Sequence, residues 1–251
     1  MQRLTGTITI ILLALFTSCG QRQDNREVSE QKTIESIELE SDTLTNEQRH
    51  YFDTTLTINN RSFRLLIQDI NEDEITLTFF REYEIIKIDT LESGGLGNIE
   101  FVDFNKDSYS DFLITYIGNV ATYDLYLFDE QKNQILFLDG FRGFPEATQL
   151  ETNKKYYYSY HRAGCADMNW VSDLFYIDNF KTVHVGHIYG QGCDYEVKDN
   201  SQTIEIYKVI DNDENKKIKV EKLPYLNHIT KFGDKWTFIE KYWNKNYKKY
   251  D

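Results

Sequence analysis

Residues 103–111, with the sequence DFNKDSYSD, carry the oxygen-bearing side chains that could bind a calcium ion. Asp103, Asn105, Asp107 and Asp111 stand at relative positions 1, 3, 5 and 9, and the main-chain carbonyl of Tyr109 is available at position 7. A hard cation such as Ca²⁺ takes about six to eight oxygen ligands of these kinds. The spacing therefore predicts a calcium loop, and the alternative is an Asx-turn connection of the same shape without a metal.

Apolar, strand-like runs flank this loop, over residues 99–102 before it and residues 112–114 after it. Helix-loop-helix calcium motifs differ, because they need helices on both sides and a Glu at position 12, where this chain has Ile114. The order strand, Asp-x-Asn-x-Asp-x-x-x-Asp, strand resembles the calcium-bearing loop of the FG-GAP or VCBS repeats that build integrin-type β-propellers. The chain departs from that pattern at Ser108, where those loops usually carry Gly. The resemblance implies a propeller-like architecture.

A looser resemblance extends over roughly residues 97–190. The acidic loop is followed by aromatic, strand-like segments at residues 123–129, 156–160 and 174–177. This order is similar to single-domain periplasmic lipoproteins of propeller-like architecture. Some of those lipoproteins are immunity proteins that inhibit peptidoglycan hydrolases delivered by rival bacteria. The resemblance implies a protein-binding function, and it transfers no inhibitory residue to this chain.

The N-terminus has the pattern of an export signal. Arg3 precedes an apolar run over residues 8–16, which is too short to span a bilayer comfortably. The run ends in Thr17-Ser18-Cys19, which resembles the bacterial lipoprotein signal, in which the Cys is acylated and becomes the mature N-terminus. We therefore expect a signal peptide over residues 1–18 and a lipid anchor in the bilayer at Cys19. An ordinary signal or anchor with an incidental Cys is the alternative.

The residues after Cys19 predict a tether and then one domain. Residues 20–50 contain no aromatic residue and are rich in polar side chains, a composition that cannot bury a core. Residues 51–251 hold 36 of the 37 aromatic residues, enough for a substantial core. The expected organisation is a flexible tether over 19–50 and a single domain over 51–251. The expected location is the bacterial cell envelope, on the periplasmic or surface face of the outer membrane.

The chain has three cysteines. If Cys19 carries lipid, Cys165 and Cys193 remain as an even pair in a compartment that permits disulfides, and one disulfide is predicted. Two free thiols, or a metal site with His184 and His187, are the alternatives. The metal site is disfavoured, because residues i and i+3 of a regular strand point to opposite faces.

Alternating apolar residues predict strands almost throughout the domain, with clear examples at residues 56–58, 75–79, 123–127 and 204–206. Short polar turns are expected at residues 59–60, 178–179 and 211–213. Residues 93–97 are Gly-rich, but a strand rather than a helix follows, so they predict a tight turn instead of a phosphate loop. The expected fold class is all-β and antiparallel, propeller-like or, alternatively, a β-sandwich.

One helix is expected at the C-terminus. Asp234 can cap it, and Trp236, Ile239, Trp243 and Tyr247 would share one face. Six Lys against three acidic residues make residues 231–251 basic, and a membrane-surface or partner-binding helix is the alternative to packing on the sheet.

Composition argues for binding rather than catalysis. With 41 acidic and 28 basic residues, the net charge is −13, which disfavours nucleic acid as a partner. The sequence has neither a Gly-x-Ser-x-Gly nor a His-Glu-x-x-His motif, so we expect no enzyme activity. One hypothesis is a calcium-stabilised inhibitor or immunity protein whose acidic surface binds a basic peptidoglycan hydrolase. The alternative is a glycan- or envelope-binding module with an aromatic platform formed by Tyr157, Tyr158, Trp170 and Tyr189.

Overall fold

The computed structural model describes residues 50–193 and 202–251. The expected signal peptide, the lipidation site Cys19 and all but the last residue of the expected tether lie outside this part of the chain. Within it, no helix is both long enough and apolar enough to cross a membrane.

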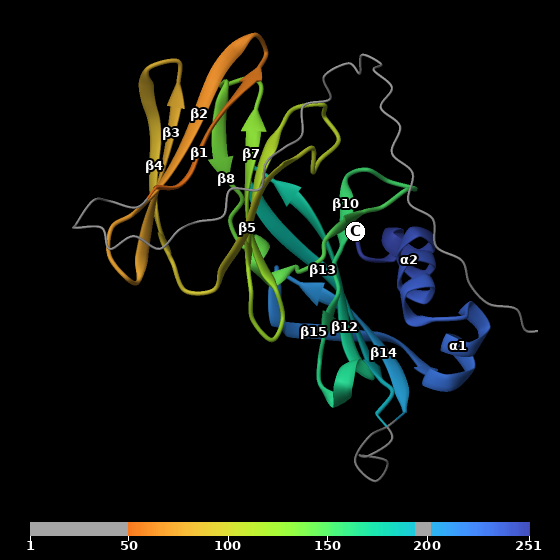
Figure 1. The fold of residues 1–251 in the computed structure, drawn as a ribbon. Coiled ribbons are helices and arrows are strands. Elements are labelled where there is room, and N and C mark those ends of the chain that lie inside the picture. Colours follow the sequence, from red (N-terminus) through yellow and green to blue (C-terminus); the bar gives the residue numbers. More distant parts are fainter. Residues whose placement is uncertain (1–49, 194–201) are drawn as a thin grey trace, which may run out of the picture. The chain divides into compact units, whose positions relative to one another are not determined.

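Three antiparallel sheets make up most of the described residues (Figure 1). Sheet 1 is a four-stranded meander in chain order, formed by β1 (His50–Ile58), β2 (Arg61–Asp69), β3 (Glu74–Arg81) and β4 (Glu84–Glu92). Sheet 2 is a second such meander, formed by β5 (Leu96–Val102), β6 (Asp111–Tyr116), β7 (Thr122–Asp129) and β8 (Gln134–Phe137).

Sheet 3 is larger and follows the order β15-β14-β13-β12-β10-β9, with β11 beside β12. Its strands are β9 (Thr148–Gln149), β10 (Tyr156–Tyr158), β11 (His161–Arg162), β12 (Asn169–Asp178), β13 (Lys181–Gln191), β14 (Thr203–Ile210) and β15 (Asp213–Pro224). The helical segments are η1 (Phe141–Gly143), η2 (Cys165–Asp167), α1 (Tyr225–Phe232), α2 (Lys235–Asn246) and η3 (Tyr247–Lys249). The prediction of an antiparallel, mostly β fold is confirmed, and the described residues close neither a barrel nor a propeller.

Sheet 2 contributes to two different cores, because alternate side chains of its strands point to opposite faces. Phe112 and Ile114 of β6 pack into a core with sheet 1. On the other face, Leu125 and Leu127 of β7 pack with η1 and with Phe175 of sheet 3. The central strands of sheet 2 are therefore buried on both sides. A third core lies between the opposite face of sheet 3 and the C-terminal helices.

Tight turns connect the two strands of several hairpins. Asn59 and Asn60 both have positive φ, 50° and 59°, and Asp211 and Asn212 have 55° and 57°. Positive φ at both central residues matches the right-handed twist of paired strands, and Asn and Asp tolerate it well. The turns expected at these two places are confirmed. The turn expected at 178–179 lies one residue later, because Asp178 still pairs with Lys181.

The C-terminus has two α-helices, so the expectation of one helix is wrong. The Asp234 side chain caps α2 by accepting a hydrogen bond from the Thr237 N–H at 2.7 Å, as the sequence predicts. The buried face of α2 is the expected one in part: Ile239 and Trp243 are buried as predicted, but Phe238 and Tyr242 complete the face, and Trp236 is 47% exposed. The missed helix α1 has no side-chain cap at its start, but Lys231 in its last turn and Gly233 just after it are signals of a helix end that the prediction did not use.

The predicted disulfide between Cys165 and Cys193 is confirmed, with Cα atoms 5.7 Å apart. It joins η2 to the residues that follow β13. Neither sulfur is therefore a free thiol ligand for a metal.

Candidate functional site

The predicted calcium loop connects β5 to β6 and is closed by its own side chains. The Asn105 side-chain oxygen accepts a hydrogen bond from the Asp107 N–H at 3.1 Å, and Asp107 Oδ1 accepts one from the Tyr109 N–H at 2.8 Å. Asp103 Oδ2 accepts a third bond from the Ser108 N–H at 3.1 Å. These bonds bring the expected ligand residues into one compact turn.

Ser108 adopts the backbone conformation that favours glycine. Its φ is 74°, and Lys106 two residues earlier has φ of 60°. A non-glycine residue in this region costs about 1 kcal/mol or more, so the loop maintains its shape against an intrinsic preference. The departure of Ser108 from the FG-GAP pattern thus leaves the turn itself intact.

Asp111 ends the loop in a buried position and is only 1% exposed. Its carboxylate accepts hydrogen bonds from the main-chain N–H groups of Phe104 and Phe128, each at 3.0 Å. Burial raises the pKa of this carboxyl to about 7, although the two hydrogen bonds lower it. A nearby cation would stabilise the ionised form, and carboxylate and carbonyl oxygens are the ligands that Ca²⁺ prefers. The residue types of the loop therefore suit a calcium ion, but among the described residues its three carboxylates do not converge within 4.8 Å of one another as the ligands of a bound metal do.

A second cluster of candidate ligands lies on the face of sheet 3 that carries Phe175 and packs towards sheet 2. Asp173 of β12 and His187 of β13 are cross-strand partners, and His187 Nδ1 lies 2.7 Å from Asp173 Oδ1. His184 Nε2 lies 3.0 Å from the same carboxylate oxygen. All three side chains are buried, so two imidazole rings meet one carboxylate oxygen away from bulk water.

The expectation that His184 and His187 point to opposite faces is wrong, because β13 contains a β-bulge. Leu174 pairs with Gly186 and Phe175 pairs with His184, which leaves Val185 as an extra residue between the two pairs. One extra residue reverses the alternation of side chains along a strand. The sequence signals this bulge only weakly, through the glycine at position 186 within the strand.

The Asp173 carboxyl is held in its ionised form. Burial alone would raise its pKa, but hydrogen bonds from His184 and His187 outweigh this effect and keep the pKa below its ordinary value. The main chain of Asp173 is also anchored, since its carbonyl accepts the Ser159 N–H at 2.9 Å and its N–H donates to Ser159 Oγ at 3.3 Å. The cluster is therefore a fixed anion with two imidazoles directed at it.

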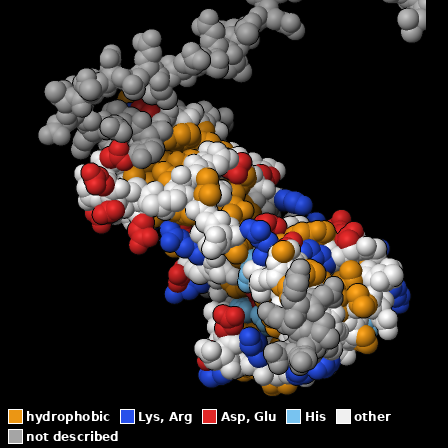
Figure 2. Space-filling view, turned by 60° about the horizontal axis from the view of Figure 1, so that its bottom comes forward, with side chains coloured by type: hydrophobic (Ala, Val, Ile, Leu, Met, Phe, Trp, Pro, Cys, Tyr) orange, Lys and Arg blue, Asp and Glu red, His pale blue; other side chains and the backbone are white. Residues whose placement is uncertain are grey.

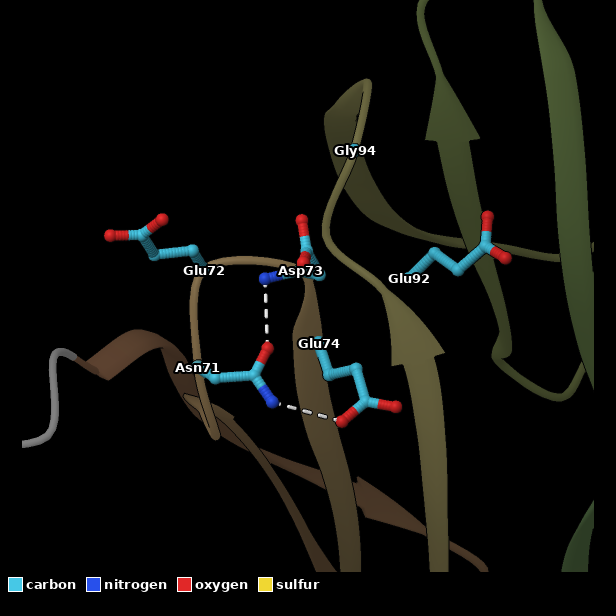
Figure 3. Close-up of a pocket in the computed structure, with 6 residues that line it drawn as sticks. All are labelled: Asn71, Glu72, Asp73, Glu74, Glu92 and Gly94. Atoms are coloured by element: carbon cyan, nitrogen blue, oxygen red, sulfur yellow. Dashed lines mark hydrogen bonds between the residues drawn. The ribbon is translucent and has the colours of Figure 1, made fainter.

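The hairpin between β2 and β3 forms an acidic concavity with the end of β4. This cavity has a volume of about 720 Å³ and is lined by Asn71, Glu72, Asp73, Glu74, Glu92 and Gly94. Asn71 shapes the turn, because its side chain accepts the Asp73 N–H at 2.8 Å and donates to Glu74 at 3.0 Å (Figure 3). Figure 3 shows the four carboxylates spread apart around the turn. We call Glu72, Asp73, Glu74 and Glu92 the acidic end of sheet 1.

The four aromatic residues of the glycan-platform hypothesis do not share one face. Tyr157 pairs with Phe175, and Tyr189 pairs with Val171, on the face of sheet 3 that packs towards sheet 2. Tyr158 and Trp170 lie on the opposite face, and Trp170 is completely buried. These aromatic residues therefore do not form a common platform for sugar stacking.

Comparisons with known proteins assign no family. No protein-family profile matches the chain, and no curated protein matches it. Among solved structures, one described as a Xanthomonas protein related to the type IV secretion system is similar, with 14% sequence identity and a TM-score of 0.41. The similarity covers 67% of this chain and 93% of that one. At this level of similarity, it carries no argument about function.

Proposed function

We propose that this chain is a non-enzymatic lipoprotein of the bacterial cell envelope that acts by binding a basic protein partner through the acidic end of sheet 1. The partner class that we propose is a peptidoglycan hydrolase, which the chain would inhibit as an immunity protein does. Anchoring would use the acylated Cys19, on the strength of the signal pattern in the sequence.

The observation that carries the proposal is the uneven distribution of charge. Residues 50–140, which include sheets 1 and 2, contain 17 acidic and six basic residues. Residues 141–193 and 202–251 contain 13 acidic and 16 basic residues. In the face shown in Figure 2, a group of acidic side chains lies at one end, and Lys and Arg side chains are scattered over the rest. The electric field of such a charge distribution favours the encounter of this end of the protein with the basic surface of a partner.

The acidic end is also free of compensating cations among the described residues that line it. The carboxylates of Glu72, Asp73 and Glu92 are in none of the ion pairs formed in ranges 50–193 and 202–251. By contrast, Glu205 on sheet 3 is paired with both Lys219 and Lys222. Unpaired, exposed carboxylates attract a cationic partner without first breaking internal salt bridges.

We also propose that sheets 1 and 2 correspond to two blades of a propeller-like fold. Sheets 1 and 2 are both four-stranded meanders that pack through a shared apolar core, and propellers are built from sheets of this kind. This arrangement supports the interpretation of the two sheets as blade-like units. The calcium loop would then connect the first two strands of the second unit and stabilise it.

Calcium should bind the β5–β6 loop and raise the melting temperature of the protein. Asp107→Asn retains an acceptor for the Tyr109 N–H but removes one negative charge. We expect it to weaken Ca²⁺ binding by roughly tenfold or more, as measured by calorimetric titration and by thermal melts with and without chelator. Asp213→Asn, at the start of β15, is the matched control, because the Asp213 side chain likewise accepts a main-chain N–H two residues later. Absence of saturable binding to the unmodified chain would leave the loop as an Asx-turn connection.

Reversing charge at the acidic end should slow association with a basic partner. The double variant Glu72→Lys/Asp73→Lys should lower the association rate constant at least tenfold at low salt, and the difference should shrink at high salt. The measurement is surface plasmon resonance against a panel of basic peptidoglycan hydrolases. Glu214→Lys/Asp178→Lys makes the same change of charge on sheet 3. The proposal would be contradicted if both double variants lowered the association rate constant equally, or if the unmodified chain did not bind.

A further inference from the structure

We propose that Asp173, His184 and His187 form a binding site for a divalent transition-metal ion, with Zn²⁺ as the preferred occupant. The proposal rests on the geometry of β12 and β13 alone. It depends neither on the proposed protein-binding function nor on the calcium loop. That loop joins two strands of sheet 2, whereas the cluster lies on sheet 3.

The ligand chemistry selects the class of metal. Two imidazole nitrogens and one carboxylate oxygen suit borderline ions such as Zn²⁺, whereas Ca²⁺ takes oxygen ligands. One oxygen ligand within this cluster cannot meet the coordination of calcium, and no thiolate is present to favour a softer ion such as Cu⁺. Three protein ligands would leave a fourth position for water or another small ligand.

The distances are close to those of a metal centre. The three candidate ligand atoms all lie within 4.8 Å of one another. Asp173 Oδ1 lies 2.7 Å from His187 Nδ1 and 3.0 Å from His184 Nε2. Two ligands bound at about 2.0–2.1 Å in a tetrahedral site lie roughly 3.3 Å apart. To admit the ion, the two distances to Asp173 Oδ1 would have to lengthen by roughly 0.3–0.6 Å.

The β-bulge in β13 is the second argument for a metal site. The bulge at Val185 interrupts the pairing of β13 with β12, and its effect is to bring both histidines to the Asp173 side. The main chain just before the bulge is held in place, since the Asn212 side chain accepts the His184 N–H at 2.6 Å and donates to the Thr182 carbonyl at 3.3 Å. Bulges that re-aim side chains are common beside functional sites.

The competing interpretation is a hydrogen-bonded cluster without a metal. In that case both ring nitrogens that face Asp173 carry protons and donate them, and His184 Nε2 also lies 2.9 Å from the Gly186 carbonyl oxygen. In the metal-bound case the same nitrogens offer lone pairs instead. Substitutions that retain an N–H donor at the same place but lack the imidazole nitrogen that binds Zn²⁺ therefore distinguish the two states.

The test uses the full-length purified chain with saturating Ca²⁺, so that the calcium loop does not compete for the titrant. Zn²⁺ is titrated calorimetrically, and Co²⁺ is added separately as a spectroscopic probe. His187→Asn places an amide N–H near the Nδ1 position, and His184→Gln places one near the Nε2 position. His228→Gln is the control, because His228 lies outside the cluster and its ring nitrogen is within hydrogen-bond distance of the Pro224 carbonyl.

We expect one equivalent of Zn²⁺ to bind the unmodified chain and the His228→Gln variant, and to raise their melting temperatures by several degrees. Each cluster variant should lose more affinity than the roughly 10- to 100-fold loss that removal of an outer-shell partner causes. Their metal-free melting temperatures should stay close to that of the unmodified chain. Saturable binding with unchanged affinity in both cluster variants would overturn the proposal.

The Co²⁺ spectrum provides a test that does not depend on the folding of any variant. A four- or five-coordinate site with nitrogen and oxygen ligands should give visible absorption bands that saturate at one equivalent and disappear when Zn²⁺ is added. A Co²⁺ spectrum that stays that of the hydrated ion would show that the cluster is held by hydrogen bonds alone.

Discussion

Replacing Arg142 with Met should lower the free energy of unfolding by about 3 kcal/mol, because it leaves the buried Asp124 carboxylate without its cation. Arg142 donates two hydrogen bonds to Asp124, at 2.6 and 2.7 Å, and Asp124 is 1% exposed. The guanidinium also covers the Tyr116 ring at 4.6 Å, and the Tyr116 hydroxyl donates to Asp124 at 3.0 Å. The expected loss lies at the low end of the range for broken buried pairs, since the Arg142 side chain is 47% exposed.

Urea denaturation measures this effect, and two further variants identify its cause. Arg64→Met breaks a pair of similar geometry with Asp53, but both partners are substantially exposed, so we expect a loss of at most about 1 kcal/mol. Adding Asp124→Asn to Arg142→Met removes the stranded charge and should restore part of the stability. If Arg142→Met and Arg64→Met have equal effects, burial of Asp124 does not determine the strength of this pair.

Replacing Trp243 with Ala should lower the free energy of unfolding by about 3–5 kcal/mol. Trp243 is completely buried between α2 and sheet 3, and its Nε1–H donates to Ser172 Oγ at 2.9 Å. The ring lies so close to β13 that a Cβ atom at Gly186 would meet it at 2.9 Å. The substitution leaves a large cavity and an unpaired hydroxyl in the core, and the surrounding backbone cannot collapse freely into it.

Trp236→Ala is the matched control on the same helix, because Trp236 is half exposed and contacts mainly Tyr160. We expect it to cost about 1 kcal/mol or less, so urea midpoints of the two variants should separate clearly. A small effect of Trp243→Ala, comparable with that of Trp236→Ala, would mean that α2 is not an integral part of the sheet 3 core.

Local patterns in the sequence predicted several features because short-range chemistry determines them. Alternation of apolar residues predicts the strands, and Asn and Asp predict the positive φ values of the turns at 59–60 and 211–212. Asp234 predicts the start of α2, because a side-chain acceptor is needed for a free N–H at that place. The spacing of oxygen side chains over 103–111 predicts a calcium loop between two strands; the structure has the loop between its strands, and calcium binding stays a prediction.

The pairing of Cys165 with Cys193 was also predictable, although by compartment and count rather than by geometry. That prediction assumed export to an oxidising compartment and a lipid on Cys19, which leaves two cysteines. Only the fold shows that the two cysteines lie close together in space, since they are 28 positions apart in the sequence.

Tertiary structure alone decided which faces the side chains occupy. The sequence specified the histidines, but the bulge at Val185 placed His184 and His187 together at Asp173, because a single extra residue in a strand reverses every later orientation. Likewise, the sheet that Tyr157 and Trp170 share separates them onto opposite faces, and packing against sheet 3 selects Phe238 and Tyr242 of α2 over Trp236. Residue types and local conformation therefore follow from the sequence of this protein. The convergence of distant residues on one site depends on strand register and packing, which only the folded chain defines.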